Sequence, residues 1–212
     1  MAGYLGNAPT AVPLSSADLQ DNIITSAKIA NGAITGDDIN STFNLTGKTV
    51  TLPAGTGGKV LQVVSTTKTD TFSGSATANN NTYADITGMS LSITPSSSSN
   101  KILVFFSAYG NSYNSDGWIR LVRGSTAICI GDASSNRRGI STGKFNIPSS
   151  NVALLHYSNF YLDSPSATSA TTYKLQYATN GDSFYFNRTW NDTDDSSGPR
   201  SASTITAIEI AG

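Results

Sequence analysis

The fold is decided by a short alternating segment near the end of the chain, STITAIEI at residues 203–210. Successive side chains of a strand point to opposite faces of a sheet, so we expect Ile205, Ala207 and Glu209 to share one face. The opposite face then carries Thr204, Thr206, Ile208 and Ile210. Because this second face mixes hydroxyl and aliphatic groups, we interpret it as a surface that meets another subunit rather than water.

Further strand-like segments precede this one at short and nearly even intervals. Turn-rich runs such as residues 95–100 and 196–199 separate them. Many short strands with such spacing predict an all-β fold, an antiparallel β-sandwich or barrel. The segments that we predict as strands are residues 59–65, 68–73, 82–86, 90–94, 101–109, 118–124, 126–131, 143–147, 151–163, 172–179, 183–189 and 203–210.

The charge composition argues against two classes of partner. Charged residues make up 13% of the 212 residues, about half the usual share of ~25%, and 13 Lys and Arg nearly balance 14 Asp and Glu. The longest apolar run, residues 102–106, is far shorter than the ~18 residues of a membrane helix. We therefore expect neither nucleic-acid binding nor membrane insertion.

Aromatic residues are distributed very unevenly along the chain. Of the 9 Tyr, 8 Phe and 2 Trp residues, only Tyr4 and Phe43 precede Gly58. Residues 1–58 therefore lack the side chains for a core of their own. The remainder has enough large apolar residues for one domain of ordinary size.

The aromatic-poor front contains a repeat of ten residues. In each repeat a Ser or Thr follows the first aliphatic residue, and a second aliphatic residue comes five positions after the first. Two buried side chains per repeat do not offset an ordering cost of roughly 1–2 kcal/mol per residue. We therefore expect identical chains to wrap around an axis in a trimeric shaft, although a disordered linker with chance periodicity is the alternative. The shaft residues are Leu14, Leu19, Ile24, Ile29, Ile34 and Ile39.

The chain resembles a known group of proteins at both ends. Residues 1–40, which begin MAGYLGNAP and contain ITSAKIANGAIT, resemble the N-termini of tail-fibre and related virion proteins of marine bacteriophages. The rest of the chain resembles a companion domain of those proteins. The segments that carry this resemblance are GKVLQVVS at 58–65, ITPSSSSNKILV at 93–104, WIRLVRG at 118–124, FYLDSP at 160–165 and STITAIEIAG at 203–212.

This resemblance implies a homotrimeric virion protein, assembled in the host cytoplasm and exposed on the extracellular particle. It implies an attachment arm at residues 1–13, which precedes the shaft at 14–55, and a head at 59–212. We interpret GTGGK at 55–59 as a glycine hinge, residues 56–58, rather than as a phosphate-binding loop, because Val60 stands where that loop needs Ser or Thr. The head is expected to be a jelly roll, similar to the trimeric heads of complement and tumour-necrosis-factor-like proteins. The residues expected to contact other virion proteins of the tail or capsid are Tyr4, Leu5, Asn7 and Pro9.

Two other functions stay open at this point. A chain this short also suits a capsid-surface fibre, a decoration protein or a tail adaptor without receptor contact. The second alternative is a secreted carbohydrate-binding or hydrolytic module.

Residues that could carry catalysis or bind a metal are scarce. His156 is the only histidine and Glu209 the only glutamate, so a glycosidase pair has no positive support. Cys129, between two isoleucines, is interpreted as a buried residue within a strand. The acidic loop WNDTDDSS at 190–197 matches no EF-hand spacing. We expect no enzymatic activity, no cofactor and no metal.

Binding is better supported than catalysis, because aromatic and Arg side chains in loops commonly anchor recognition surfaces. Aromatic rings also suit sugars, so a host-surface glycan is the expected ligand. Trp118 is interpreted instead as a core residue at a strand end. The candidate binding residues are Tyr113, Arg137, Arg138, Trp190, Asp192, Asp194 and Arg200.

Overall fold

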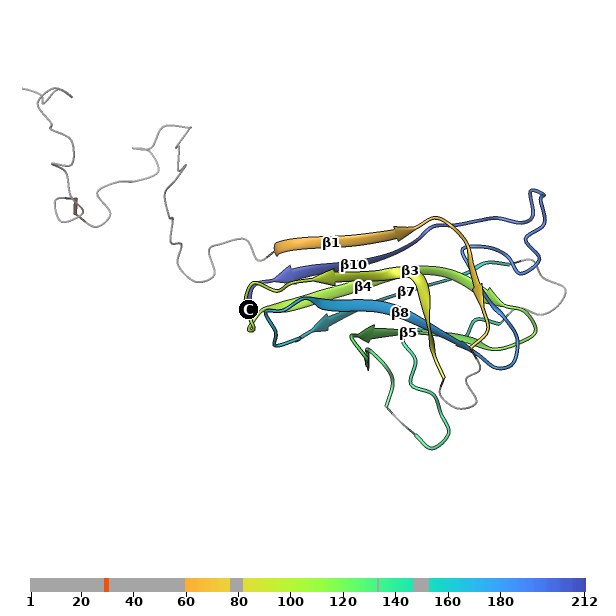
Figure 1. Ribbon diagram of the computed structural model, residues 1–212, viewed down its shortest axis with the longest axis horizontal. Helices are drawn as coiled ribbons and strands as arrows, with labels where there is room; N and C mark the ends of the chain where they lie inside the picture. The colour runs from red at the N-terminus through yellow and green to blue at the C-terminus, as the bar shows by residue number, and fades with distance from the viewer. Residues whose placement is uncertain (1–28, 31–59, 77–81, 133, 147–152) are drawn as a thin grey trace, which may run out of the picture. The chain divides into compact units, whose positions relative to one another are not determined.

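A computed structural model describes residues 29–30, 60–76, 82–132, 134–146 and 153–212 (Figure 1). All regular elements in these residues are strands, which confirms the all-β prediction. The strands are β1 (Val60–Lys68), β2 (Phe72–Gly74), β3 (Ala84–Ile93), β4 (Lys101–Ser112), β5 (Gly117–Arg123), β6 (Thr126–Ile128), β7 (Leu155–Asp163), β8 (Thr171–Thr179), β9 (Phe184–Phe186) and β10 (Ser203–Ile210).

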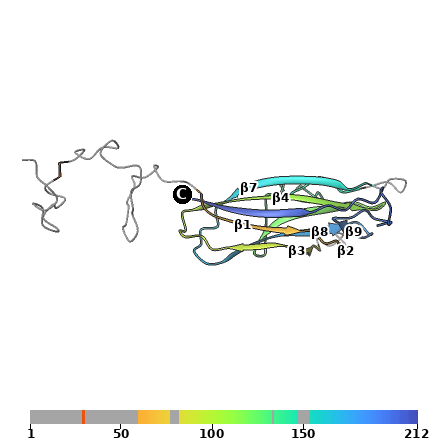
Figure 2. The same cartoon turned by 90° about the horizontal axis from the view of Figure 1, so that it is seen from above.

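The strands form two antiparallel sheets, whose layers can be followed in Figures 1 and 2. The first sheet has the order β1-β10-β4-β9-β2, and β7 also pairs with β4. Residues 101–107 of β4 pair with β10, and residues 110–112 of β4 pair with β9. Strands β9 and β2 therefore extend the first sheet beyond the end of β10. The second sheet has the order β3-β8-β5-β6.

The core lies between the two sheets. Alternate residues of β4 and β10 are fully buried there, and Ile205, Ala207 and Glu209 share the inner face as predicted. The largest buried rings come from both sheets, which ties the two layers together by apolar burial. These rings belong to Phe106, Phe145, Tyr173, Phe184 and Phe186.

The register of the paired strands shows which strand ends lie together at each end of the sandwich. Val60 and Lys101 both pair with Ile210, so the start of β1 and the end of β10 lie together. We call this the proximal end. Strands β1 and β4 run away from it, so the loops at 113–116 and 187–202 lie at the opposite, distal end (Figure 1).

Two buried acidic groups stabilise the proximal half. Burial alone would raise the pKa of Glu209, but hydrogen bonds from Gln62, Asn100 and Ser96 lower it to about 2. Asp163 accepts hydrogen bonds from Arg123 Nη1 at 2.7 Å and from the Tyr173 hydroxyl at 2.6 Å. Because Arg123 lies in the second sheet and Asp163 in the first, this network joins the layers.

Several predictions of individual strands need correction. The segments at 82–86 and 90–94 form one strand, β3, because Gly88 at φ +86° allows a bulge where the register with β8 shifts. In the described part of the predicted strand at 143–147, residues 143–146, Phe145 forms an isolated bridge with Gly117 and no longer strand is present. Cys129 follows the end of β6 at φ +53° and is half-buried, so the prediction of a buried strand position was wrong.

Most predictions for the N-terminal region lie outside the described residues. This holds for the arm at 1–13, the hinge at 56–58 and the shaft residues other than Ile29. Ile29 is described and its side chain is exposed. Tyr4, Leu5, Asn7 and Pro9 therefore remain predicted virion contacts.

Candidate functional site

The outer surface of the first sheet carries a continuous row of aliphatic side chains. Pairing aligns Val63 of β1 with Ile208 of β10, Ile208 with Leu103 of β4, and Leu103 with Leu162 of β7. These residues alternate with the core positions of the same strands, so they point away from the sandwich. Val63 is 58% exposed and Leu162 is 53% exposed.

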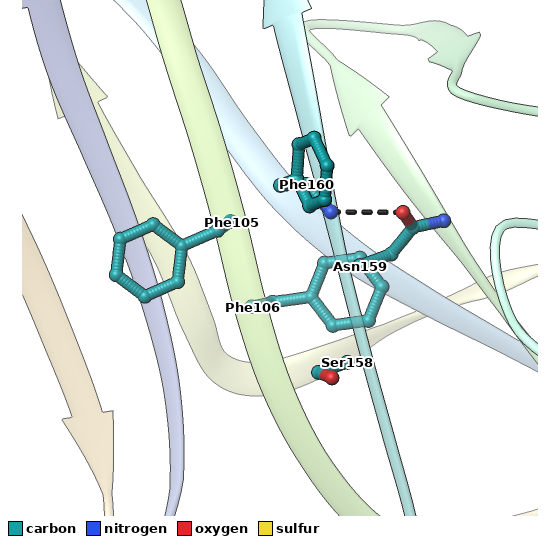
Figure 3. Close-up of a pocket in the computed structure, with 5 residues that line it drawn as sticks. All are labelled: Phe105, Phe106, Ser158, Asn159 and Phe160. Carbon is teal, nitrogen blue, oxygen red and sulfur yellow. Dashed lines mark hydrogen bonds between the residues drawn. The ribbon is translucent and has the colours of Figure 1, made fainter.

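A second row adds two phenylalanines. Phe105 of β4 pairs with Phe160 of β7, and both rings are exposed, Phe160 by 74%. Figure 3 shows the Phe160 ring next to Asn159 on β7, and the Phe105 ring projecting from β4 away from β7. A hollow of about 380 Å³ is lined by Phe105, Phe106, Ser158, Asn159 and Phe160. We call Val63, Leu103, Phe105, Phe160, Leu162 and Ile208 the apolar face.

The single histidine lies on the same side of the first sheet. His156 stacks on Tyr109, with ring centroids 4.5 Å apart, and its Nε2 shares a 2.8 Å hydrogen bond with Ser107 Oγ. A catalytic dyad also needs a group that orients the imidazole. No carboxylate is hydrogen-bonded to His156 among the residues that the structure describes. The pair therefore supports a structural contact better than nucleophilic catalysis.

The distal end brings together several of the predicted binding residues. Tyr113 and Trp190 stack with centroids 4.0 Å apart. Asp192 accepts hydrogen bonds from Arg200 at 3.0 Å and forms an ion pair with Arg188 at 3.3 Å. The hydrogen bond from Arg200 lowers the pKa of Asp192.

Asp192, Asp194 and Arg200 line a hollow of about 420 Å³ in this distal loop. Nearby, Asn111 Oδ1, Thr189 Oγ1 and Asn191 Oδ1 are buried without a hydrogen-bond partner among the described residues. Buried oxygens of this kind are commonly satisfied by ordered water. In the described part of the chain, no group of three or more His, Cys, Asp or Glu residues is placed to hold a metal ion.

Arg137 and Arg138 belong to a different surface, on the second sheet. The Arg138 guanidinium lies over the Trp118 ring, 4.8 Å from its centroid, and Arg120 lies 3.8 Å from the centroid of Tyr83. Burial raises the pKa of Tyr83, and the positive charges of Arg120 and Arg138 oppose that rise. The set of predicted binding residues thus divides between two places on the head.

The core interpretation of Trp118 is confirmed in one respect, because its side chain is only 9% exposed. It packs with Ala178, Tyr83 and Ile140 in a small cluster separate from the main core.

Sequence reasoning missed two sets of residues. Phe105 and Phe160 look like core residues in an apolar run, and only the register shows that both face outward. Tyr83 and Arg120 lie 37 positions apart and gave no local signal. Tyr83 directly precedes β3 and Arg120 lies in β5, and these two strands become neighbours of β8 only in the folded sheet.

Comparison with known proteins identifies no relative: no family model matches the chain, and no curated protein matches it. The resemblance to phage fibre proteins therefore stays a prediction. Within the described residues, no helix has the length and apolar character needed to cross a membrane.

Proposed function

We propose that the chain is a bacteriophage virion structural protein, a short homotrimeric tail fibre or spike. Its N-terminal arm attaches to the particle, and its β-sandwich head faces the host surface and binds a glycan there. The observation that carries this proposal is the apolar face, which crosses all four long strands of the first sheet.

An exposed apolar face of this kind favours self-association. Soluble monomers rarely expose contiguous apolar patches, and each Val, Leu or Phe side chain that becomes fully buried contributes about 1.5–3 kcal/mol. Three copies around a threefold axis, each with its apolar face inward, bury Val63, Phe105, Phe160 and Leu162 together. The same symmetry supplies the neighbours that the ten-residue repeats need.

The strand order supports a jelly-roll head. Without the short strands β2 and β9, the orders are β1-β10-β4-β7 and β3-β8-β5-β6. Two four-stranded sheets whose neighbours are mostly distant in sequence are typical of a double-sheet jelly roll. A head of this topology can associate through one sheet and leave the other accessible.

The polarity of the head suits attachment at one end and binding at the other. The described part of the head starts with Val60 at the proximal end, beside Ile210. The stacked rings of Tyr113 and Trp190 lie at the distal end. A glycan-binding role for the distal loops is consistent with these partly exposed aromatic rings.

The hydrolytic alternative has less support. A general acid must hold a proton near neutral pH, but the hydrogen bonds to Glu209 lower its pKa to about 2. The capsid-surface fibre, decoration protein and tail adaptor share the trimeric head and differ in location on the particle.

The first test is the mass of the purified full chain by light scattering. We expect three times the chain mass of 22.1 kDa, because the apolar face and the repeats both need neighbours. A stable monomer would overturn the proposal.

A reconstruction of the phage particle tests the location. We expect residues 1–13 to reach the tail while the head faces outward. Contact of these residues with the capsid would favour the capsid-surface alternative instead.

A further inference from the structure

The outer surface of the second sheet holds a pocket unlike anything on the apolar face. Arg120 and Trp118 of β5 alternate with Ile119 and Leu121, which belong to the main core. Both side chains therefore point away from the sandwich. They lie on the side opposite the apolar face, so association through the first sheet leaves this outer surface of the second sheet accessible, although Trp118 itself is covered by its neighbours.

A turn after β6 completes this pocket. The amide of Arg137 donates to the Ser134 carbonyl at 3.0 Å, which closes the turn. Its continuation is anchored by Ser141, whose buried hydroxyl accepts from the Leu121 amide at 2.9 Å and donates to the Ile128 carbonyl at 3.2 Å. The anchored segment holds Arg138 over Trp118.

The resulting cavity has a volume of about 330 Å³ and contains three arginines. Its described lining includes no acidic residue. The lining residues are Tyr83, Arg120, Ile130, Gly131, Ser135, Arg137, Arg138 and Gly139.

The charge of Arg120 is not cancelled by its hydrogen-bond partner. Its Nε and Nη2 donate to Gln176 Oε1 at 3.0 and 2.8 Å, and this amide oxygen is neutral. The amide nitrogen of Gln176 donates to Asp85 at 2.7 Å, but Asp85 already forms a 2.8 Å ion pair with Lys174. The pocket therefore keeps a positive potential.

Arg137 provides a second cation at the rim. Its side chain is exposed, and no hydrogen bond or ion pair of its guanidinium to a described residue is present. An exposed guanidinium beside a fixed one suits a carboxylate or sulfate, because guanidinium donors match the spacing of such oxygens.

We propose that this pocket binds the acidic group of a carboxylated or sulfated saccharide; this rests on the proposed glycan-binding function, names its ligand class and adds a binding place on the second sheet to the distal loops. The volume decides between a sugar and a bare ion, because ligand pockets start at roughly 300 Å³ and an ion fills little of that space. Ile130, which is 42% exposed, provides an apolar wall against which a sugar ring can pack.

The test measures binding of fluorescent trigalacturonate to the full chain by anisotropy. The neutral methyl ester of the same trisaccharide is the matched ligand control, and a sulfated galactotriose distinguishes sulfate from carboxylate. Arg137→Gln is the principal variant because its side chain is exposed. Lys144→Gln removes a cation whose side chain is also exposed (54%) and which lies in neither candidate binding site, so it is the matched protein control.

We expect one or both acidic probes to bind and the ester to bind at least about tenfold more weakly, since charge-assisted hydrogen bonds dominate. Arg137→Gln should weaken binding roughly tenfold to hundredfold, and Lys144→Gln should leave it unchanged. Arg120→Gln is a second variant that should also weaken binding. Its thermal unfolding is measured to show that it remains folded. Added salt should weaken binding because the rim is exposed.

Equal binding of acid and ester, or no effect of Arg137→Gln, would overturn the inference. So would full competition by equimolar inorganic phosphate, which would indicate a general anion site. Light scattering on the same samples separates this result from the proposed function. A trimer without acidic-glycan binding contradicts only the pocket, whereas a monomer with Arg137-dependent binding contradicts only the fibre.

Discussion

The two outer surfaces of the head differ in the side chains that they present. The first sheet exposes Phe160 and Leu162 in aligned apolar rows. The second sheet exposes the linked polar groups of Asp85, Gln176 and Arg120. Two sheets around one core thus have surfaces suited to different neighbours, one to apolar protein and the other to water and charged ligands.

The physical basis of this difference is the cost of desolvation. Apolar side chains gain free energy when they leave water, whereas charged groups lose hydration and need paired partners. A head that associates through the first sheet and binds ligands on the second satisfies both conditions.

The largest expected effect comes from placing charge on the apolar face. Phe160→Asp combined with Leu162→Asp should convert the proposed trimer into a monomer, because each buried, unpaired carboxylate costs several kcal/mol. Both side chains are exposed in the single chain, so its fold should be retained. Light scattering reports the mass and circular dichroism the fold.

The matched control puts two carboxylates on the other surface. Ser90→Asp and Ser92→Asp alter exposed residues of β3 in the second sheet and should leave the mass unchanged. Dissociation by this control pair, but not by the first pair, would reverse our assignment of the two surfaces.

An intermediate effect is expected from Glu209→Gln, which separates loss of stability from loss of association. Glu209 lies on β10 beside Ile208 but faces inward and accepts hydrogen bonds from Gln62, Ser96 and Asn100. The amide cannot accept all of these bonds, so the free energy of unfolding should fall by about 2–4 kcal/mol. Urea unfolding measures this loss, and the oligomeric mass should not change at neutral pH.

The pH dependence gives a further check on this variant. The folded-state pKa of Glu209, about 2, is below its ordinary value of 4.5, so its stabilisation is complete above pH 4.5 and is lost as the pH falls towards 2. The stability difference between wild type and variant should shrink over this window. A constant difference would contradict the role given to the carboxylate.

The smallest effect is expected at the solvated ion pair of the second sheet. Asp85→Asn removes the pair with Lys174, in which the Asp85 side chain is 52% exposed. Exposed pairs contribute about 0–1 kcal/mol, so urea unfolding should show a change within that range. A loss above ~2 kcal/mol would show that this surface is less solvated than described.

Much of the fold could be predicted because alternation in a strand is a local property. The inward set of β10 followed directly from STITAIEI. The single long β3 could not be predicted, because Gly88 resembles a turn residue until β8 pairs on both sides of it. Cys129 was misplaced because neighbouring isoleucines suggest a strand, whereas its φ of +53° ends one.

The candidate sites were harder to predict than the strands. Residue type alone suggested Tyr113, Trp190 and the arginines, and the structure does group Tyr113 with Trp190. Residue type alone could not place Arg138 over Trp118 rather than at the distal loop, because that position depends on how a turn packs on a sheet.

The sequence by itself determined the all-β class and the inward face of β10. These follow from composition and from a period of two residues, which act locally along the chain. Only the tertiary structure decided that Phe105 and Phe160 are register partners on an exposed surface and that Arg120 and Arg138 line one pocket. Register and sheet order set those contacts, and both depend on the simultaneous pairing of segments far apart in the chain.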